Sequence, residues 1–585
     1  MKTKKMLITA IAIIAFIAST QAQNVNIPDA IFKAELVANS SINTNMDAEI
    51  QVSEASVFNG GISLVTYTEA NGTTSGLNIT DLTGIEAFVA LDSLNCSFNQ
   101  ISGLDVSSNI ALTYLNCSGN QLTSLNVSAN SALTNLYCSW NQLTSLDLSS
   151  CTALTGLNCY HNQLISLDLS GSTALTTLEC GINQLTILDV SSCTALTSLT
   201  CSNTNALTSL DVSSCTALTS LTCSNNNALT SLDVSACTAL TSLTCIGNNL
   251  TSLDVSSCTA LTTLNCQQTQ LTSLDVSSCT ALTSLTCSNN QLTSLDVSDC
   301  NALVSLSCSN NQLTSLDVSS CTALTSLTCS NNNALTSLDV SACTTLTSLY
   351  CIDNNQLTSL DVSGCTALTT LVCANNQITS LDVSSCSALT TLVCNTNTLT
   401  SLDVSACTAI TYLNCIGNNL TSLDVSNNTT LYRLYCNNNY LTSLNVKNGN
   451  NINMFEWENP LDGSYSPAFL AYNNPNLSCI EVDNVAWSIA NWSNYIDPTA
   501  YFSENCSGVS VLDYNKNGAI SAYPNPTTGT IYLSEPANIT LSDLSGKLLL
   551  EQKNTNQLDI SGLPAGMYFL HFGENNQQTF KVIKE

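Results

Sequence analysis

The sequence is poor in basic residues. Its 585 residues include 11 Lys and Arg against 41 Asp and Glu, which gives a formal net charge of −30. Between Lys33 and Arg433 there is no lysine or arginine at all. Binding to nucleic acid phosphates or to an anionic membrane surface requires clustered basic side chains. The composition therefore argues against DNA, RNA, nucleotides and anionic membranes as partners of this long region.

Histidine is scarcer still. The two histidines, His161 and His571, lie far apart in regions of different composition. A His-based catalytic triad or histidine metal cluster needs its members close together in the fold. No other catalytic constellation stands out, so we expect a protein that is not an enzyme and has no catalytic residues.

Long apolar runs are missing, with one exception. Lysines at positions 2, 4 and 5 precede an apolar run from Met6 to Ala18, and small residues follow up to Ala22. This run is too short to span a bilayer and is typical of a secretory signal peptide. We predict a signal peptide over residues 1–22, export of the remainder and no transmembrane segment.

One repeat fills most of the chain. A unit of 21 residues, sometimes 22, recurs from about Leu91 to Leu441, and residues 282–302 form a representative copy. So regular a period is typical of a solenoid, in which each coil buries its apolar edge only by stacking on its neighbours. One cysteine marks the same position in seventeen consecutive copies: Cys96, Cys117, Cys138, Cys159, Cys180, Cys201, Cys223, Cys245, Cys266, Cys287, Cys308, Cys329, Cys351, Cys373, Cys394, Cys415 and Cys436.

Each coil has two halves of ten or eleven residues. The first half reads Leu-x-x-Leu-x-Cys-x-x-Asn and the second reads Leu-x-x-Leu-Asp-Val-x-x-Cys, as in residues 282–290 and 292–300. The apolar fourth and sixth positions indicate a strand with one buried face. A half this short leaves no room for a packed helix, so we expect parallel strands or extended turns. The asparagine at the ninth position is expected to hydrogen-bond buried turn backbone.

A second set of cysteines ends the second half of most coils, from Cys151 to Cys407. Within either set, neighbours lie one coil apart, roughly 4.8 Å, which exceeds the ~3.8 Å between Cβ atoms that a disulfide prefers. We interpret both sets as small buried apolar residues, with ladder disulfides or a metal site as the alternatives. Only Cys479 and Cys506 fall outside both sets, and we predict a disulfide between them.

These repeats resemble leucine-rich repeats, and the nesting of two motifs in 21 residues is similar to the bacterial irreko-type class. The resemblance implies a right-handed, β-rich solenoid of about 17 units with parallel strands. It also implies a scaffold for binding or display and leaves the ligand open. We predict a signal peptide (1–22), a small helical N-terminal cap (23–76), the solenoid (77–446), a C-terminal cap (447–512) and a C-terminal domain with its linker (513–585).

The last of these segments carries a second resemblance. Its motifs look like the type A C-terminal sorting domain of the type IX secretion system. That resemblance implies a β-sandwich, a Bacteroidota protein, and release or display at the outer-membrane surface by the type IX secretion machinery. The residues that carry it are Tyr523, Pro524, Asn525, Pro526, Gly529, Gly566, Tyr568 and Lys581.

Residues 43–54 resemble an EF-hand calcium loop between two candidate helices. Ala48 replaces the glycine of the sharp turn and an asparagine replaces the first aspartate, so a weak extracellular calcium site is expected. A polar helix-capping loop is the alternative. The metal ligands that the resemblance implies are Asn43, Asn45, Asp47, Glu49 (through its carbonyl) and Glu54.

Residues 447–512 bring four aromatic residues together with the cysteine pair: Phe455, Trp457, Trp487 and Trp492. A solenoid needs a cap over the core edge of its last coil. We interpret this segment as that cap, with a carbohydrate-binding module as the alternative.

The fifth position of the second half is aspartate in almost every coil, at Asp105 and from Asp147 to Asp424. Stacking places these carboxylates in a row, where neighbours repel each other by roughly 1 kcal/mol. Raised pKa values, Ser and Thr donors, or bound divalent cations are three ways to offset this repulsion. A cation stripe is the functional hypothesis, and an acidic solvated face is the alternative.

The outward third, fifth, seventh and eighth positions of the first half, here called the first-half face, vary most between coils. Clustered exposed aromatics often mark binding sites for sugars or proteins, whereas packing against the caps is the alternative. Phe98 and Tyr114 lie on this face near its start. The residues predicted to bind ligand are Tyr137, Trp140, Tyr160, His161, Tyr412, Arg433 and Tyr435.

We therefore predict an exported, secreted or cell-surface protein that binds or adheres to a protein or glycan through the first-half face. The alternative is a calcium-stiffened stalk or surface-layer element without a specific ligand, and calcium is the one cofactor considered. Ice binding by a threonine row is a third interpretation, which interruptions of the row weaken. These threonines are Thr200, Thr222, Thr244, Thr286 and Thr328.

Overall fold

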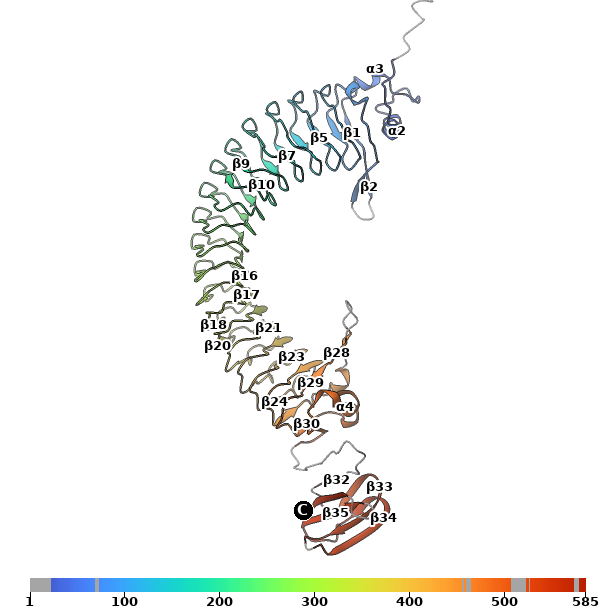
Figure 1. Ribbon diagram of the computed structural model, residues 1–585, viewed down its shortest axis with the longest axis vertical. Coiled ribbons are helices and arrows are strands. Elements are labelled where there is room, and N and C mark those ends of the chain that lie inside the picture. Colours follow the sequence, from blue (N-terminus) through green and yellow to red (C-terminus); the bar gives the residue numbers. More distant parts are fainter. Residues whose placement is uncertain are drawn as a thin grey trace, which may run out of the picture. The chain divides into compact units, whose positions relative to one another are not determined.

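A computed structural model describes residues 23–68, 73–454, 457–458, 465–506, 522–525, 527–544, 546–572 and 578–584. The chain divides into two compact units, Met1–Leu346 and Thr347–Glu585. Figure 1 labels the helices and strands. The predicted signal peptide lies outside the described residues. Among the residues that are described, no helix has the length and apolar character needed to cross a membrane.

The first half of every coil forms a short strand in parallel register with its neighbours. In unit 1 these strands are β1 (Gly61–Ser63), β4 (Ser93–Asn95), β5 (Tyr114–Asn116), β6 (Asn135–Tyr137), β7 (Gly156–Asn158), β8 (Thr177–Glu179), β10 (Ser198–Thr200), β12 (Ser220–Thr222), β13 (Ser242–Thr244), β14 (Thr263–Asn265), β15 (Ser284–Thr286), β16 (Ser305–Ser307) and β17 (Ser326–Thr328). In unit 2 they are β19 (Ser348–Tyr350), β21 (Thr370–Val372), β22 (Thr391–Val393), β23 (Tyr412–Asn414), β25 (Arg433–Tyr435) and β29 (Phe469–Leu470).

This confirms the predicted solenoid of parallel strands and extends it. The first-half strands from β4 to β25 correspond to the seventeen coils that the repeat cysteines mark. β1 and β29 come from the flanking caps. The register keeps leucines in line: Leu115 pairs with Leu94 on one side and Leu136 on the other. Side chains on either side of that leucine point outward, which creates the first-half face.

The second half of the coils is less regular. Its strands are β9 (Ile187–Asp189), β11 (Ser209–Asp211), β18 (Ser337–Asp339), β20 (Ser359–Asp361), β24 (Ser422–Asp424) and β26 (Ser443–Asn445). Two strands of the C-terminal cap, β30 (Cys479–Glu481) and β31 (Tyr501–Ser503), continue the sheet of β24 and β26. Elsewhere isolated bridges join aspartates of successive coils, such as Asp254 and Asp275. Extended turns therefore take the place of strands in many second halves.

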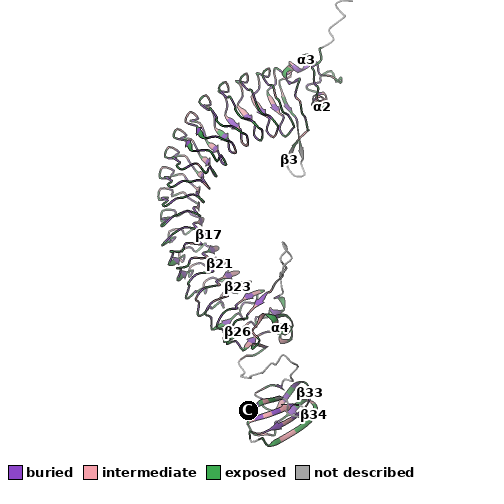
Figure 2. Cartoon of the chain, viewed as in Figure 1, coloured by how far each residue is buried: buried purple, intermediate pink, exposed green. Residues whose placement is uncertain are grey.

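The interior is mostly apolar: the repeat cysteines, nearly all leucines and the valines of the second halves are buried, and Figure 2 colours the chain by burial. A recurring asparagine is buried with them, and several coils bury a second polar residue, such as Ser288 or Asn130. The recurring asparagine confirms its predicted role: Asn141 Nδ2 donates to the carbonyls of Cys117 at 3.0 Å and Cys138 at 3.1 Å. Its Oδ1 accepts the backbone N–H of Leu122 at 3.0 Å. Each such residue thus satisfies turn backbone that stacking removes from water.

The repeat cysteines are free and buried, as the sequence predicts. Burial raises the pKa of Cys117 to about 12. In the second set, Cys279 Sγ contacts the Val255 carbonyl oxygen at 3.7 Å, in the geometry of a weak donor. Within the described residues no three His, Cys, Asp or Glu side chains are grouped so as to hold a metal ion.

The caps close the solenoid with short helices. At the N-terminus lie α2 (Ala30–Ala38), α3 (Val52–Ala55), η1 (Ile85–Ala87) and the hairpin of β2 (Val65–Thr68) and β3 (Thr73–Gly76). The C-terminal cap contains η2 (Asn451–Asn453), β27 (Trp457–Glu458), β28 (Tyr465–Ser466), α4 (Val485–Trp492) and η3 (Ser493–Tyr495). A disulfide joins Cys479 to Cys506.

Trp492 is the centre of the C-terminal cap. It is 2% exposed and stacks on Phe469 with a centroid distance of 4.3 Å. Its ring is therefore not available to stack on a sugar, which weighs against a carbohydrate-binding module built on this residue. Phe455 lies outside the described residues.

The C-terminal domain is an antiparallel sheet. Its strands are β32 (Ala522–Tyr523), β33 (Thr530–Ser542), β34 (Leu548–Asp559), β35 (Gly566–Phe572) and β36 (Gln578–Lys584). Ile531, Leu541, Leu570 and Val582 belong to the buried cluster that holds it together.

Candidate functional site

In unit 1 the structure brings the predicted aromatic residues together. We call Phe98, Tyr114, Tyr137, Trp140, Tyr160 and His161 the aromatic patch. Tyr114 and Tyr137 stand on neighbouring strands β5 and β6, with ring centroids 5.5 Å apart. Trp140 stacks on His161 at 3.9 Å and lies 6.0 Å from Tyr160. The patch spans four consecutive coils and runs from the strands into the turns that follow them.

The turn members of this patch sit in an unfavourable backbone conformation. Phe98, Trp140 and His161 have φ of 56°, 53° and 56°, in the left-handed region. Most other coils place glycine or asparagine at this turn position, as at Gly119 and Asn289. A bulky side chain costs about 1–2 kcal/mol in this conformation. Such strain is a mark of functional positions when the residue that causes it has no structural task.

Two of these strained residues are only partly packed and leave half of their surface exposed. Trp140 and Phe98 are each 52% exposed. Phe98 leans over Gly119 of the next coil, where an added Cβ would lie 2.7 Å from its ring. The rings are therefore displayed at the surface at a cost in backbone strain, which favours recognition over a structural role.

A hollow that no motif in the sequence predicts opens in the strand face beside the patch. It has a volume of about 120 Å³ and is lined by Asn135, Tyr137, Thr155, Gly156, Leu157, Asn158, Thr176, Thr177 and Glu179. Its sequence signal is Gly156, a glycine at the first strand position, where the other repeat coils carry a side chain. We call this feature the Gly156 hollow.

In unit 2 the predicted residues also meet, in a different setting. The Arg433 Cζ lies 5.5 Å from the centre of the Tyr412 ring, and Tyr412 and Tyr435 lie 5.7 Å apart. The Tyr435 hydroxyl donates to the Pro467 carbonyl at 2.8 Å, and burial raises its pKa. Tyr435 therefore packs on the C-terminal cap, which favours the packing interpretation for this cluster.

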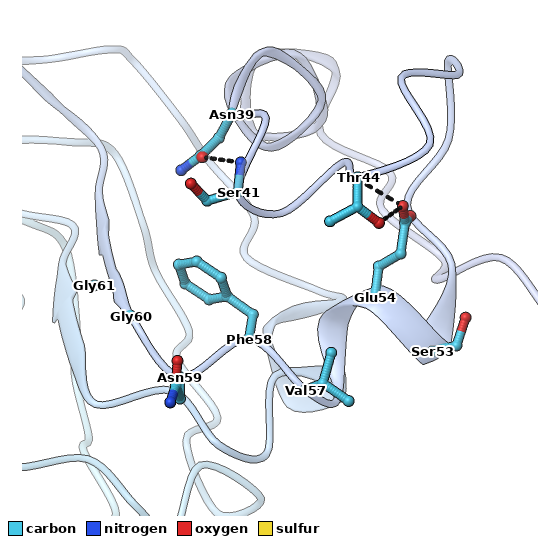
Figure 3. Close-up of a pocket in the computed structure, with 10 residues that line it drawn as sticks. All are labelled: Asn39, Ser41, Thr44, Ser53, Glu54, Val57, Phe58, Asn59, Gly60 and Gly61. Carbon is cyan, nitrogen blue, oxygen red and sulfur yellow. Dashed lines mark hydrogen bonds between the residues drawn. The ribbon is translucent and has the colours of Figure 1, made fainter.

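The candidate calcium loop is held by its own hydrogen bonds (Figure 3). Glu54 Oε1 accepts from the backbone N–H and the hydroxyl of Thr44, both at 2.9 Å. Glu54 Oε2 accepts the Gln51 N–H at 3.0 Å, completing a capping box at the start of α3. Burial raises the pKa of Glu54, but hydrogen bonds from Gln51, Asn45 and Thr44 outweigh it and lower the pKa.

Three other predicted ligands also make contacts within the protein, although Asn43 Oδ1 is buried without a hydrogen-bond partner among the described residues. Asp47 Oδ1 accepts the Glu49 N–H at 2.7 Å, and the Glu49 carboxylate pairs with Lys33 at 2.7 Å. Asn43 Nδ2 donates to the Asp47 carbonyl at 2.8 Å. The donor set thus fits a helix-capping loop better than a cation site. Thr44 and Glu54 also line an open cavity of about 610 Å³ that reaches Phe58 (Figure 3).

Each aspartate of the row accepts a hydrogen bond from its own coil. Asp275 Oδ1 accepts the backbone N–H of Ser277 at 2.9 Å, and the same bond recurs along the row. Raised pKa values were one of the three ways considered above to offset the repulsion between neighbouring aspartates, and this prediction is wrong. Hydrogen bonds from the serine two residues later lower the pKa of these carboxyls. The aspartates affected are Asp105, Asp147, Asp168, Asp189, Asp233, Asp254, Asp275, Asp296, Asp317, Asp361, Asp382 and Asp403.

These serine hydrogen bonds predict how stability depends on pH. Each pKa is lower in the folded chain than in the unfolded chain, where it is about 3.9. The stability that this contributes is complete above about pH 5 and is lost as the pH falls through the folded pKa. We expect the melting temperature, followed by circular dichroism at constant ionic strength, to be level from about pH 8 to 5 and to fall below about pH 4.

Asparagine at the same position provides the control for this prediction. Asn126 naturally replaces the aspartate and accepts the Ser128 N–H at 3.0 Å. We therefore expect Asp275→Asn to leave the melting temperature at neutral pH unchanged and to reduce the loss in acid. A melting temperature that rises between about pH 5 and 3 would instead mean that repulsion along the row outweighs the serine bonds.

The sorting-signal residues tie the two ends of the C-terminal domain together. Asn525 Nδ2 donates to the Lys581 carbonyl at 2.6 Å, and its Oδ1 accepts the Ile583 N–H at 2.7 Å. Tyr523 pairs with Tyr532 between β32 and β33, and the Tyr568 hydroxyl donates to the Pro564 carbonyl at 2.6 Å. Gly529 immediately precedes β33, and Gly566 begins β35. Pro526 lies outside the described residues.

Two families match parts of the chain. Residues 521–585 match the secretion system C-terminal sorting domain. Residues 259–300, 301–342 and 366–407 each match the family described as leucine-rich repeats in two copies. No curated protein matches the chain significantly.

Solved structures of bacterial proteins are similar to the chain. They include the functional domain of InlJ from Listeria monocytogenes, described as including a cysteine ladder (28% identity, 96% of this chain and 98% of that chain, TM-score 0.48). YopM from Yersinia enterocolitica is a further example, with 22% identity over 66% of this chain and 84% of that chain and a TM-score of 0.45. A leucine-rich-repeat protein of Leptospira interrogans, LIC12759, has 21% identity over 61% of this chain and 80% of that chain and a TM-score of 0.35. Since all three TM-scores lie below 0.5, we infer nothing about ligands from them.

Proposed function

We propose that this chain, a leucine-rich-repeat protein with a type IX secretion sorting domain, binds a protein or glycan through its aromatic patch. The sorting domain sends the protein to the cell surface or out of the cell, so the patch meets extracellular ligands. We propose adhesion or capture as its role, and binding rather than catalysis.

One observation carries this proposal. Phe98, Trp140 and His161 occupy left-handed turn positions that asparagine or glycine would fill with less strain. Ile182, Gln268 and Thr396 share this conformation at the same turn position, so the conformation alone does not mark a binding site. What distinguishes the patch is that its strained residues are aromatic and that Trp140 and His161 lie beside each other. The stacked Trp140 and His161 form a rigid, amphipathic surface next to Tyr160. Rigid aromatic side chains supply contact area at a low cost in conformational entropy.

The calcium-stiffened stalk has no comparable support. The aspartate row and the N-terminal loop both satisfy their carboxylates with protein donors. A further argument for recognition is that the aromatic patch varies from coil to coil, whereas a stalk requires only that coils repeat.

Replacing Trp140 by asparagine tests the proposal. We expect binding to protein and glycan arrays to fall by about 10-fold or more, as for a hot-spot aromatic residue. The melting temperature is expected to stay level or to rise, because asparagine tolerates the left-handed region. Loss of binding with retained stability separates recognition from a folding defect.

Ile165→Asn is the matched control, since Ile165 is 64% exposed and lies in the second half of a nearby coil. It removes an exposed apolar side chain away from the first-half face and is expected to leave binding intact. If every array signal of the native chain survives Trp140→Asn, the aromatic patch is not the binding site.

A further inference from the structure

We propose that the Gly156 hollow is a subsite for one uncharged pyranose ring of a glycan. This inference rests on the proposed function and narrows its ligand class. The hollow lies on the strand face, where Tyr137 of one coil and the Glu179 carboxylate of another both line it.

The hollow lies beside Gly156, whose missing side chain lets the Asn135 amide lie close over the strand. A Cβ at this position would lie 2.7 Å from Asn135 Nδ2 and 3.8 Å from the Tyr137 hydroxyl. The φ of Gly156 lies outside the left-handed region, so the backbone does not require glycine here. Glycine weakens a strand and often marks a place where a ligand approaches the backbone. At this position it makes room on a face that side chains cover in neighbouring coils.

The walls of the hollow carry the groups that recognise a sugar. Tyr137 is half-buried and lines the hollow, with its hydroxyl next to Gly156, and an aromatic ring at this place can contact the C–H groups of a pyranose. The Asn135 amide donates one hydrogen bond to the Tyr137 hydroxyl at 3.4 Å and has a second N–H for a ligand. Asn158 Nδ2 pairs with Glu179 Oε2 at 2.6 Å across the next two strands. A paired amide and carboxylate can donate to one of two adjacent hydroxyls and accept from the other.

Charge decides which sugars fit. Glu179 is an exposed carboxylate at the rim, and no lysine or arginine occurs between Lys33 and Arg433. A uronic or sialic acid would bring a second carboxylate to this rim with no cation to pair it. The volume of about 120 Å³ also limits the site to one ring, since pockets that enclose drug-sized ligands measure ~300 Å³ or more. The ligand class is therefore a neutral monosaccharide unit bound weakly.

Saturation-transfer-difference NMR with the purified full chain tests this subsite. The probes are the methyl glycosides of glucose, galactose and mannose, with methyl glucuronide as the acidic counterpart. We expect at least one neutral glycoside to bind with a millimolar Kd and the glucuronide not to bind. Gly156→Ala should weaken that binding by at least about 10-fold, because the methyl group, together with the displaced Asn135 side chain, fills the hollow.

Two further variants keep the test decisive. Gly103→Ala is the matched control, because a Cβ there meets no atom within 4 Å, and it should bind like the native chain. Glu179→Gln alters only an exposed side chain and should weaken binding several-fold even if Gly156→Ala lowers stability. Binding that survives both Gly156→Ala and Glu179→Gln, or glucuronide binding as tight as that of glucoside, overturns the inference.

The outcome also separates this inference from the proposed function. If no neutral glycoside binds but a protein ligand is captured and lost in Trp140→Asn, the sugar subsite is wrong and the proposed function stands. If neither glycosides nor array ligands bind, both are wrong.

Discussion

Replacing Asn290 by alanine is expected to lower the free energy of unfolding by about 3–5 kcal/mol. Asn290 Nδ2 donates to the Cys266 carbonyl at 3.0 Å and to the Cys287 carbonyl at 2.9 Å. Its Oδ1 accepts the Leu271 N–H at 3.0 Å. All these groups are buried, and each one left without a partner costs about 1–3 kcal/mol. Guanidinium unfolding followed by circular dichroism measures the loss.

The chain itself supplies a graded control for this prediction. Thr269 stands at the asparagine position of its coil, and its hydroxyl donates to the Cys266 carbonyl at 3.0 Å. Asn290→Thr should therefore retain part of the bonding and cost less than alanine. Gln291 is exposed, and Gln291→Ala should change stability by less than ~0.5 kcal/mol. An equal cost for all three variants would contradict the role assigned to the asparagine.

Replacing Trp492 by alanine is expected to destabilise unit 2 by about 3–5 kcal/mol. The ring is 2% exposed, stacks on Phe469 at 4.3 Å and meets the edge of Trp487 at 5.2 Å. Phe469 belongs to β29, the last strand of the first-half sheet, so the loss uncovers the end of the core. Chemical unfolding measures the cost, and hydrogen exchange should show faster opening of β29.

The control for Trp492 lies on the same helix. Ile489 in α4 is 41% exposed, and Ile489→Ala should cost less than about 1 kcal/mol. If Trp492→Ala costs no more than Ile489→Ala, then Trp492 is not what closes the solenoid. Binding by the aromatic patch in unit 1 is expected to persist in both variants.

Much of the fold could be predicted because each coil repeats the same local rules. The positions of Leu285, Cys287 and Asn290 recur at fixed spacing, so the structure predicted for one coil applies to the other coils. The two additional strands could not be predicted in this way. β29 contains Phe469 instead of the repeat leucine and follows an inserted hairpin, and its place beside β25 depends on tertiary packing. The same is true of β1, which precedes the first repeat cysteine.

The N-terminal loop shows why a motif can support two interpretations. Glu54 is the twelfth residue of an EF-hand-like pattern and also the N3 residue of helix α3. A bidentate calcium ligand and a capping box both need a carboxylate at this place. Sequence alone does not distinguish them, because the difference lies in which atoms face the carboxylate. In the structure those atoms belong to Thr44 and Gln51.

The aromatic patch was visible in the sequence, but its two informative properties were not. Trp140 stands out by residue type, whereas its left-handed φ emerges only from the conformation of the turn. The preference for glycine and asparagine at this position in other coils was the available signal. The sequence does not reveal the hollow beside Gly156, because a missing side chain affects the surface there only once the neighbouring strands are aligned. The register of the strands, which the composition does not give, is therefore needed to locate the hollow.

The turn position also separates two tasks within a coil. The Trp140 N–H donates to the Tyr160 carbonyl at 2.9 Å, and the Gly119 N–H makes the same bond to Ser139 at 2.8 Å. The link between coils thus depends on the backbone, whichever side chain stands there. Duplication or exchange of near-identical coils can therefore change the side chains on the outer surface while the buried residues and the backbone hydrogen bonds between coils stay the same. A lineage that carries such a gene has a modular means of changing the surface that the protein presents, one coil at a time.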